Sequence, residues 1–273
     1  MKAMRQFLRR VRLRLRAEWG VATADQSELG YRLNRLPLRV VAGQRFQFPW
    51  GPVEFQSASD LRGQYGEIFC RRHYAFRCPR PDPVIIDAGG NIGMSAIWFK
   101  QEYPQAQLTV FEADPDLAAV LQRNLAAAAV TDVKVEAAAV WIADGTVTFD
   151  NQGQDKGAIR GGQGITVRAV DLAAHLPARV DLLKLDVEGA EYPIIERLHA
   201  TGALHRVQNV VAEFHVRRGE VDQALGALAR LREAGMQVAF TSALGPWLGA
   251  AETPSAYEAV GTDQALMEVY AWR

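Results

Sequence analysis

One acidic residue and three glycines follow a short apolar run in the segment VIIDAGGNIG, residues 84–93. Three β-branched residues after a proline favour a buried strand, and the glycines then allow a sharp turn and the close approach of a ligand. Apolar residues between Ile92 and Lys100 recur at helical spacing. A strand, a glycine turn and a helix in this order predict a site for a nucleotide-like ligand. The cofactor-binding candidates here are Asp87, Gly89, Gly90, Asn91 and Gly93.

The spacing of these glycines argues against a dinucleotide. A dinucleotide fingerprint needs glycines at relative positions 1, 3 and 6, but counting from Gly89 places Asn91 and Met94 there. Asp87 would repel a pyrophosphate and favour a cationic group. We therefore expect S-adenosylmethionine, which carries a sulfonium and an ammonium and no phosphate. Its carboxylate could use free amides near the following helix N-terminus. Asp87 would either accept the ammonium or organise the turn.

Carboxylates also end the later strands of the expected sheet, and open parallel sheets bind ligands outside the carboxyl ends of their strands. The run QLTVFE ends at Glu112, about 20 residues after the turn, where a carboxylate can chelate a ribose diol. The alternative is a plain surface carboxylate. Ala113 follows and is a further cofactor-binding candidate. A later strand ends at Glu213, with His215 just beyond.

The segment LLKLDVEGAEY, residues 182–192, is the second informative stretch. Lys184 falls in a strand that we expect to be buried on both faces, so it needs a carboxylate partner. Asp186 lies two residues on and hence on the same face. The pair could hold a substrate hydroxyl or could be a structural ion pair. Glu188 and Glu191 are three residues apart, which predicts that they share one side of the first turn of the following helix.

The elements that position these residues alternate between strand and helix. Strands are expected at 107–112, 133–139, 180–186 and 209–215, and helices near 115–127, 190–199 and 220–234, which indicates α/β organisation. The runs TVTFD and ITVRAV predict a hairpin around a Gly-rich mobile loop at 153–164 that could cover the site. QVAFTSA and LMEVYAW add two strands at the end.

Residues 36–59 contain short β-type runs, which predict a small antiparallel accessory element. A proline-rich break at Pro79, Pro81 and Pro83 follows. We therefore predict an N-terminal segment over residues 1–78 and a cofactor-binding domain over residues 79–273.

Charge is distributed unevenly along the 273 residues. The formal net charge is zero, yet residues 1–16 carry seven basic side chains and no acidic one, so the remainder carries −7. A helix here would place apolar residues in a stripe among arginines, which suits peripheral contact with an anionic membrane. A helix docked on the domain or a partner, or a frayed end, is the alternative. Two cysteines without a zinc pattern, and no secretory signal, favour the cytoplasm.

Four segments together resemble the FkbM family of S-adenosylmethionine-dependent methyltransferases, and their order and spacing match: IIDAGGNIG, FEADP at 111–115, LLKLDVEGAEY and AEFH at 212–215. The resemblance covers roughly residues 64–216. It implies a Rossmann-like class I methyltransferase, with a seven-stranded, mostly parallel sheet and helices on both faces. To this the chain adds the N-terminal basic helix and the small β element. Gly90 replaces a common alanine, which we expect to be harmless, and AVWIAD replaces an ALSD-like segment.

The resemblance also implies methylation of oxygen, often on a sugar, glycolipid, polysaccharide or natural product. Methyl transfer needs an acceptor oxygen in line with the sulfonium and a group that accepts its proton. We predict His215 as this base and Asp186 as second choice; a packing role is the alternative for His215. The remaining catalytic candidates are Lys184 and Glu188, the substrate-binding candidates are Glu188, Glu191 and Glu213, and Asp186 is also a cofactor-binding candidate.

No dedicated metal motif is present in the sequence, although Asp186, Glu188 and Glu213 or His215 could hold Mg²⁺. The expected partner is a small-molecule or glycan acceptor and not nucleic acid, and a homo-oligomer is left open. Three alternatives remain: a nucleic-acid or other small-molecule methyltransferase, a nicotinamide-dependent oxidoreductase, and a scaffold that kept the fold without catalysis.

Overall fold

The computed structural model describes residues 43–150, 158–159, 164–217, 219–242 and 264–273. The chain divides into two compact units, Met1–Ala75 and Phe76–Arg273, and each is described by itself. The predicted boundary after residue 78 falls shortly beyond this division. The predicted basic helix at 1–16 lies outside the described residues.

The smaller unit contains an antiparallel hairpin of β1 (Gln44–Phe48) and β2 (Gly51–Phe55). Alternate residues of both strands are buried, as expected for a sheet with one covered face. The helix α3 (Ala58–Gln64) follows, capped by the Ser57 hydroxyl, and continues into the π-helix η1 (Tyr65–Arg71). Trp50 stacks between Phe48 and Phe69 with ring centroids 4.5 Å apart on either side. The small antiparallel element predicted from the sequence is therefore present.

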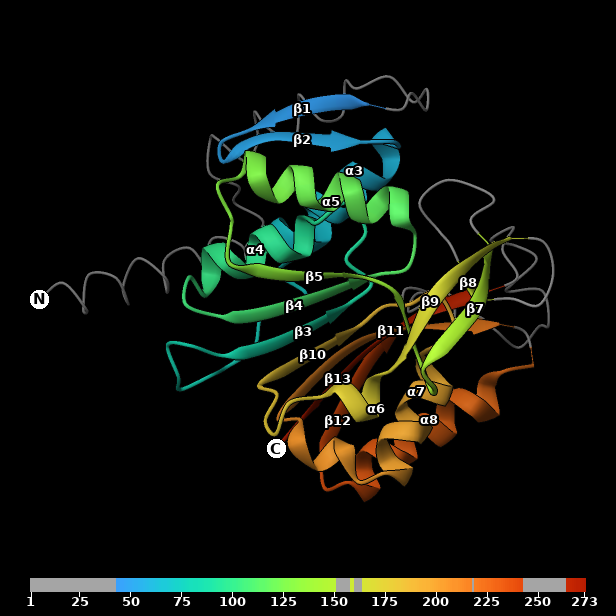
Figure 1. The fold of residues 1–273 in the computed structure, drawn as a ribbon. Helices are drawn as coiled ribbons and strands as arrows, with labels where there is room; N and C mark the ends of the chain where they lie inside the picture. The colour runs from blue at the N-terminus through green and yellow to red at the C-terminus, as the bar shows by residue number, and fades with distance from the viewer. Residues whose placement is uncertain (1–42, 151–157, 160–163, 218, 243–263) are drawn as a thin grey trace, which may run out of the picture. The chain divides into compact units, whose positions relative to one another are not determined.

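The larger unit is built on a seven-stranded sheet (Figure 1). Its strands are β3 (Val84–Ala88), β4 (Gln107–Glu112), β5 (Val133–Ala137), β10 (Leu182–Leu185), β11 (Asn209–Arg217), β12 (Gln237–Ser242) and β13 (Gln264–Trp272). The spatial order is β12-β13-β11-β10-β3-β4-β5, and only β13 runs antiparallel to its neighbours. This order confirms the predicted Rossmann-like class I methyltransferase fold. The strand order reverses between β3 and β10, where such sheets bind ligands.

Helices cover both faces of this sheet, as Figure 1 shows. The helices α4 (Met94–Glu102) and α5 (Pro115–Ala127) lie on one side. The other side carries α6 (Leu172–His175), α7 (Glu191–Ala200) and α8 (Val221–Glu233), with a short 3-10 helix, η2 (Ala203–Arg206). Asp114 begins α5 by accepting the amides of Asp116 and Leu117, and Pro115 suits the first helical position. No helix among the described residues is long and apolar enough to cross a membrane.

A second, four-stranded sheet occupies the predicted insertion. Its strands are β6 (Ala139–Trp141), β7 (Gly145–Asp150), β8 (Ala158–Ile159) and β9 (Ile165–Asp171), in the order β6-β9-β7-β8. The antiparallel pair β7–β9 confirms the predicted hairpin. The strand β6, parallel to β9, was not predicted. The loop predicted to cover the site lies mostly outside the described residues.

Candidate functional site

The turn between β3 and α4 requires glycine at its first position. Gly89 has a φ of +94°, and a Cβ placed there would lie 1.8 Å from the backbone oxygen of Asp186. The amides of Gly89 and Gly90 both donate to the Phe111 carbonyl at 2.9 Å. The turn is therefore fixed against the ends of two neighbouring strands, β10 and β4.

Gly90 lies against β4 and α5. A Cβ at this position would lie 2.3 Å from Val110 Cγ1 and 2.6 Å from Leu121 Cδ1. The turn packs closely on β4 and α5, and the branched Val110 side chain has little freedom to move aside. Glycine in place of the common alanine therefore fits this turn.

Backbone amides of the turn are already engaged within the chain. The amide of Ile92 donates to Asn91 Oδ1 at 2.7 Å, and that of Gly93 to the Gly90 carbonyl at 2.8 Å. Ile97 makes the first helical bond of α4, to Gly93. The amides that could receive a cofactor carboxylate are therefore those of residues 94–96, at the start of the helix.

Glu112 lies at the end of β4 and holds two backbone segments together. Its Oε2 accepts the Asn91 amide at 2.7 Å, and its Oε1 accepts the Asp114 amide at 2.9 Å. The side chain is buried, and burial raises its pKa to about 7 although the two amides favour the ionised form. Each oxygen keeps a lone pair, so the carboxylate can still accept both hydroxyls of a diol. Ala113 packs on the second sheet against Ala139, Phe149 and Val167.

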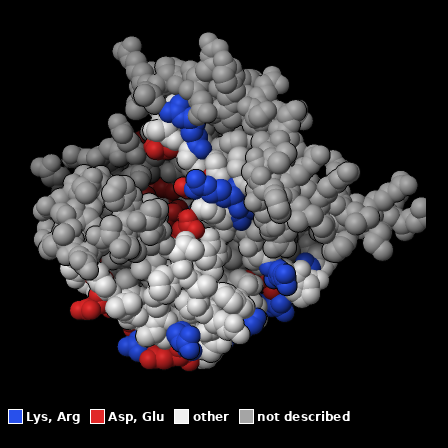
Figure 2. All heavy atoms as spheres, turned by 180° about the vertical axis from the view of Figure 1, so that it is seen from behind, with Lys and Arg blue, Asp and Glu red and all other residues white. Residues whose placement is uncertain are grey.

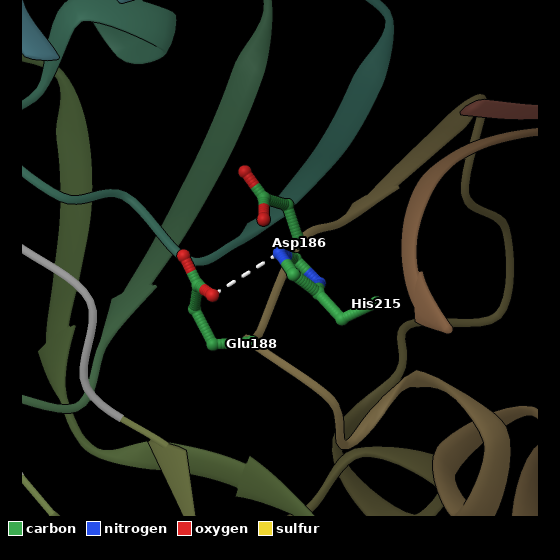
Figure 3. A group of neighbouring side chains, drawn as sticks. All are labelled: Asp186, Glu188 and His215. Carbon is green, nitrogen blue, oxygen red and sulfur yellow. Dashed lines mark ion pairs between the residues drawn. The ribbon is translucent and has the colours of Figure 1, made fainter. Parts of the chain in front are cut away.

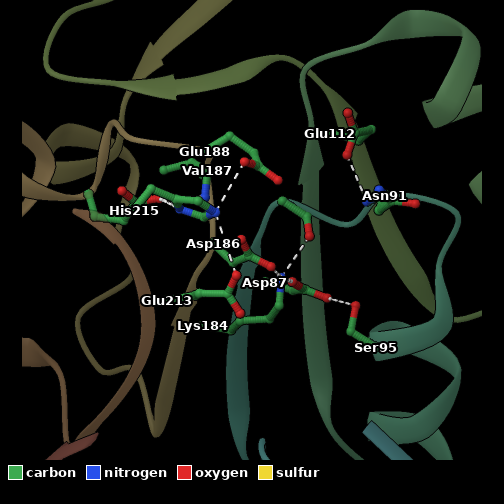
Figure 4. Close-up of polar contacts among 12 residues, drawn as sticks. Asp87, Asn91, Ser95, Glu112, Lys184, Asp186, Val187, Glu188, Glu213 and His215 are labelled. Atoms are coloured by element: carbon green, nitrogen blue, oxygen red, sulfur yellow. Dashed lines mark hydrogen bonds and ion pairs between the residues drawn. The ribbon is translucent and has the colours of Figure 1, made fainter. Parts of the chain in front are cut away.

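Asp87 and Lys184 form a buried ion pair across β3 and β10 (Figure 4). Their charged atoms lie 3.0 Å apart, and both side chains are at most 2% exposed. Ser95 donates its hydroxyl to the other Asp87 oxygen at 2.5 Å. Of the two roles considered for Asp87, this arrangement fits the organiser of the turn.

Lys184 also contacts the glycine turn and Asp186. Its Nζ donates to the Gly89 carbonyl at 2.6 Å and lies 3.7 Å from Asp186 Oδ2. Burial lowers the pKa of Lys184, but Asp87 and Asp186 raise it further, and the result lies above the ordinary value. The sequence predicted the Asp186 contact and missed the closer one to Asp87. The enclosure of Lys184 fits the structural ion pair that the sequence also allowed, and its catalytic contact with an acceptor stays a prediction.

Glu188 and Glu191 do not share a helical turn, contrary to the prediction. Glu188 has a φ of +57° and Gly189 a φ of +103°, and α7 begins only at Glu191. The buried Glu191 accepts the amides of Val187 and Gly189 at 3.0 and 3.1 Å. Its carboxylate closes the loop that the left-handed residues form. Glu191 has no exposed surface, which favours a structural role, and its substrate-binding role stays a prediction.

His215 lies among carboxylates at the end of β11. Its Nδ1 is 3.3 Å from Glu191 Oε1, and its Nε2 is 3.1 Å from Glu188 Oε2 and 3.5 Å from Glu213 Oε1. Burial lowers the pKa of His215, but Glu188 and Glu191 raise it more, to about 11. The ring is thus an imidazolium at neutral pH. An imidazolium cannot accept a further proton, so the role of His215 as general base, which requires the neutral ring, stays a prediction.

Three partly exposed carboxylates lie just after β10 and beside its end in β11, which continues past the predicted strand end to Arg217. The side chains of Asp186, Glu188 and Glu213 are 27%, 25% and 29% exposed. Burial raises the pKa of Asp186, and the nearby Lys184 and His215 oppose this rise. Ligand atoms of Asp186, Glu188 and His215 lie within 4.8 Å of one another (Figure 3). The rule that ligands bind at strand ends predicted Asp186 and His215 in this region, and Glu188 joins them from the loop after β10.

Sequence reasoning missed two residues of this region. Ser95 holds Asp87 from the first turn of α4, and Arg217 donates to the backbone carbonyl of Glu188 at 3.4 Å. A serine eight residues after the strand aspartate, near a helix start, is a weak signal. Arg217 follows His215 at the spacing of side chains on one strand face, which could have placed it here.

The sheet and the turn define a Rossmann-like methyltransferase, and the sequence comparisons agree. The methyltransferase FkbM domain matches residues 87–238, and this chain belongs to that family. Methyltransferase sdnD of Sordaria araneosa is 31% identical over 203 residues, 59% of this chain and 78% of its own length.

Two further proteins are similar. The 2-O-methyltransferase NoeI of Sinorhizobium fredii is 38% identical over 68 residues, 25% of this chain and 28% of its own length. The crystal structure of methyltransferase FkbM from Methylobacillus flagellatus KT is 14% identical with a TM-score of 0.47, and covers 72% of this chain and 46% of its own.

Proposed function

We propose that this methyltransferase transfers the methyl group of S-adenosylmethionine to a hydroxyl of a sugar, glycolipid, polysaccharide or natural product. Glu112 carries the cofactor part of this proposal. It is a buried carboxylate beside the glycine turn, fixed by two backbone amides, with lone pairs left for two donors. A ribose diol supplies two such donors, and no phosphate-binding amide is left in the turn.

The residues that would hold the cofactor surround the carboxyl ends of β3, β4 and β10. Glu112 would receive the ribose, the turn from Gly89 to Gly93 would lie against the ligand, and Asp186 would face its positive charge. The missing side chain at Gly89 lets the turn approach β10. When bound, the cofactor supplies a methyl group on a good leaving group, so orientation of the acceptor provides much of the rate enhancement.

Carboxylates at the strand ends would orient the acceptor. Asp186, Glu188 and Glu213 can each accept a hydrogen bond from a hydroxyl, and one of them would take the proton as the oxygen attacks. The charged His215 would hold Glu188 and Glu213 in place. The similarity to a 2-O-methyltransferase over part of the chain supports oxygen as the acceptor atom.

Calorimetric titration with S-adenosylhomocysteine tests the cofactor, with Glu112→Ala as the variant. We expect the variant to lose on the order of 1–3 kcal/mol of binding free energy, the cost of leaving a polar partner unmatched. Unchanged affinity would overturn the ribose assignment. Isotopic methyl transfer onto fractionated glycolipids, polysaccharides and small metabolites tests the acceptor, and a label found only on nitrogen or carbon would exclude O-methylation.

Nucleic acid is not the acceptor that we propose. A nucleic-acid methyltransferase would present a continuous basic surface beside its site. Figure 2 shows described Asp and Glu atoms near the middle of one face and at its lower edge, and described Lys and Arg atoms at several separate places on it. Salt-sensitive binding of RNA or DNA would contradict this proposal. Cofactor binding without turnover on any acceptor would instead support the scaffold alternative.

A further inference from the structure

We propose that Asp186, Glu188 and His215 bind a divalent cation that holds the acceptor oxygen. The inference rests on the proposed O-methyl transfer for the role of the ion, but not for its binding. The three side chains come from the end of β10, the loop after it and β11 (Figure 3). Two carboxylates and an imidazole are a ligand set that Mn²⁺ and related divalent ions accept.

The distances between the ligand atoms suit one ion. All three lie within 4.8 Å of one another. Ligands about 2.1 Å from an ion can be at most roughly 4.2 Å apart, so small side-chain rotations would close the group. Asp186 and Glu188 are both partly exposed, and an ion and an acceptor oxygen can reach them from solvent.

The buried Nε2 atom of His215 lies close to Glu188, another of the three proposed ligands. Its ring is 1% exposed, and Nε2 makes no hydrogen bond with any described residue, although Glu188 Oε2 lies at an ion-pair distance of 3.1 Å. A buried polar atom without an aligned partner costs free energy. A cation bound by both Nε2 and the Glu188 oxygen would satisfy the two atoms together.

The charges around the group favour a cation. Five carboxylates lie within ion-pair distance of Lys184 or His215, and most of them can be followed in Figure 4. The carboxylates are Asp87, Asp186, Glu188, Glu191 and Glu213. Asp87 pairs with Lys184, whereas Glu188, Glu191 and Glu213 surround the His215 ring. Their negative charge would attract a divalent ion, with His215 then neutral and acting as a ligand.

Glu191 holds two of the proposed metal ligands in position. Its carboxylate contacts Nδ1 of His215 at 3.3 Å and holds the loop that carries Glu188 through two amides. Metal-binding histidines commonly use their second nitrogen in this way, which fixes the ring orientation. Glu191 is therefore a positioning residue for two of the three ligands.

A cation here would lower the pKa of a bound hydroxyl and orient its oxygen. Asp186 and Glu188 would then serve as ligands and not as proton acceptors. Of the three partly exposed carboxylates, Glu213 is the one that is not a proposed ligand. It would take the hydroxyl proton as the new oxygen–carbon bond forms and the sulfur–methyl bond breaks.

Mn²⁺ titration of the chelator-treated, full-length protein tests the site, by calorimetry and by the electron paramagnetic resonance of free Mn²⁺. We expect one bound ion. Glu188→Gln should weaken binding at least about tenfold, and Glu191→Gln by a similar factor without removing a ligand. Asp222→Asn, on the exposed side of α8, is the matched control and should bind as the wild type does. Unfolding curves would show that each variant is folded.

Binding of ¹⁵N-histidine-labelled protein gives a second readout, because a coordinated imidazole nitrogen couples to the Mn²⁺ spin and a distant one does not. Absence of this coupling, or equal Mn²⁺ affinity in the wild type and Glu188→Gln, would overturn the site. S-adenosylhomocysteine binding, measured separately in chelator, keeps the two proposals apart. If S-adenosylhomocysteine binds and Mn²⁺ does not, only the proposed metal site is wrong. If Mn²⁺ binds and S-adenosylhomocysteine does not, only the proposed cofactor is wrong.

Discussion

Glu112 should make cofactor affinity depend on pH. Its burial raises the pKa to about 7, and hydrogen bonds donated by a ribose favour the ionised form. Affinity for S-adenosylhomocysteine should therefore fall as the pH drops from 8 to 6, by roughly tenfold, because the ionised fraction falls from about 0.9 to about 0.1. Calorimetry at several pH values measures this change.

The control for this prediction is Glu112→Gln, which cannot ionise and so should lose the dependence contributed by this residue. Its affinity should be weaker and nearly constant over the same range. A wild-type affinity that does not change between pH 6 and 8 would show that cofactor binding does not require the ionised form of Glu112.

Lys184 should matter more for stability than its position at the site suggests. Lys184→Met removes the positive charge beside Asp87, whose side chain is fully buried. Leaving one partner of a buried pair uncompensated costs about 3–5 kcal/mol, and urea unfolding measures the loss. The double variant Lys184→Met with Asp87→Asn should recover part of it. Equal losses in the single and double variants would mean that the pair is not the cause.

At the scale of elements, the β3–α4 turn should tolerate no side chain at its first position. Gly89→Ala would place a methyl group 1.8 Å from a backbone oxygen at a φ of +94°. We expect a loss of unfolding free energy above about 3 kcal/mol, together with lost S-adenosylhomocysteine binding.

Gly226→Ala is the matched control for this substitution. Gly226 lies within α8, and the nearest atom to an added Cβ is 3.8 Å away. The change should stabilise the protein by about 0.5–1 kcal/mol, since alanine favours the helix. Stabilisation by both variants would contradict the packing of the turn.

The sequence predicted the elements well where periodicity alone determines them. The strand QLTVFE and the helix from Pro115 to Ala127 have their expected bounds, because an apolar run, an Asp114 cap and a proline mark them locally. The strand β6 escaped prediction because three residues carry too little pattern.

Side-chain partners were predicted less well, since they depend on neighbouring strands. The register that places Lys184 opposite Asp87 joins residues far apart in the chain. Likewise, the left-handed backbone at Glu188 moves the start of α7 and turns Glu191 inward, although glutamates three apart resemble a helical pair. Local spacing could not distinguish these two outcomes. The convergence of carboxylates at the strand ends followed from topology and was predicted.

At the scale of the whole molecule, cofactor binding should reside in the larger unit alone. Every residue that we assign to the cofactor lies between Asp87 and Asp186, within Phe76–Arg273. That unit also contains the complete seven-stranded sheet and a continuous core on its α7–α8 face. A fragment spanning residues 76–273 should therefore bind S-adenosylhomocysteine with an affinity within about threefold of the full chain, a difference below about 1 kcal/mol.

The same fragment separates cofactor binding from acceptor recognition. If the smaller unit, with its hairpin and aromatic stack, recognises the acceptor, the fragment should lose methyl transfer to the natural acceptor. Calorimetry should still detect cofactor binding by the fragment. A fragment carrying Glu112→Ala is the control and should bind weakly. Loss of binding in a fragment whose unfolding is cooperative would mean that residues before Phe76 contribute to the cofactor site. The Asp87–Asp186 region would then be an incomplete description of it.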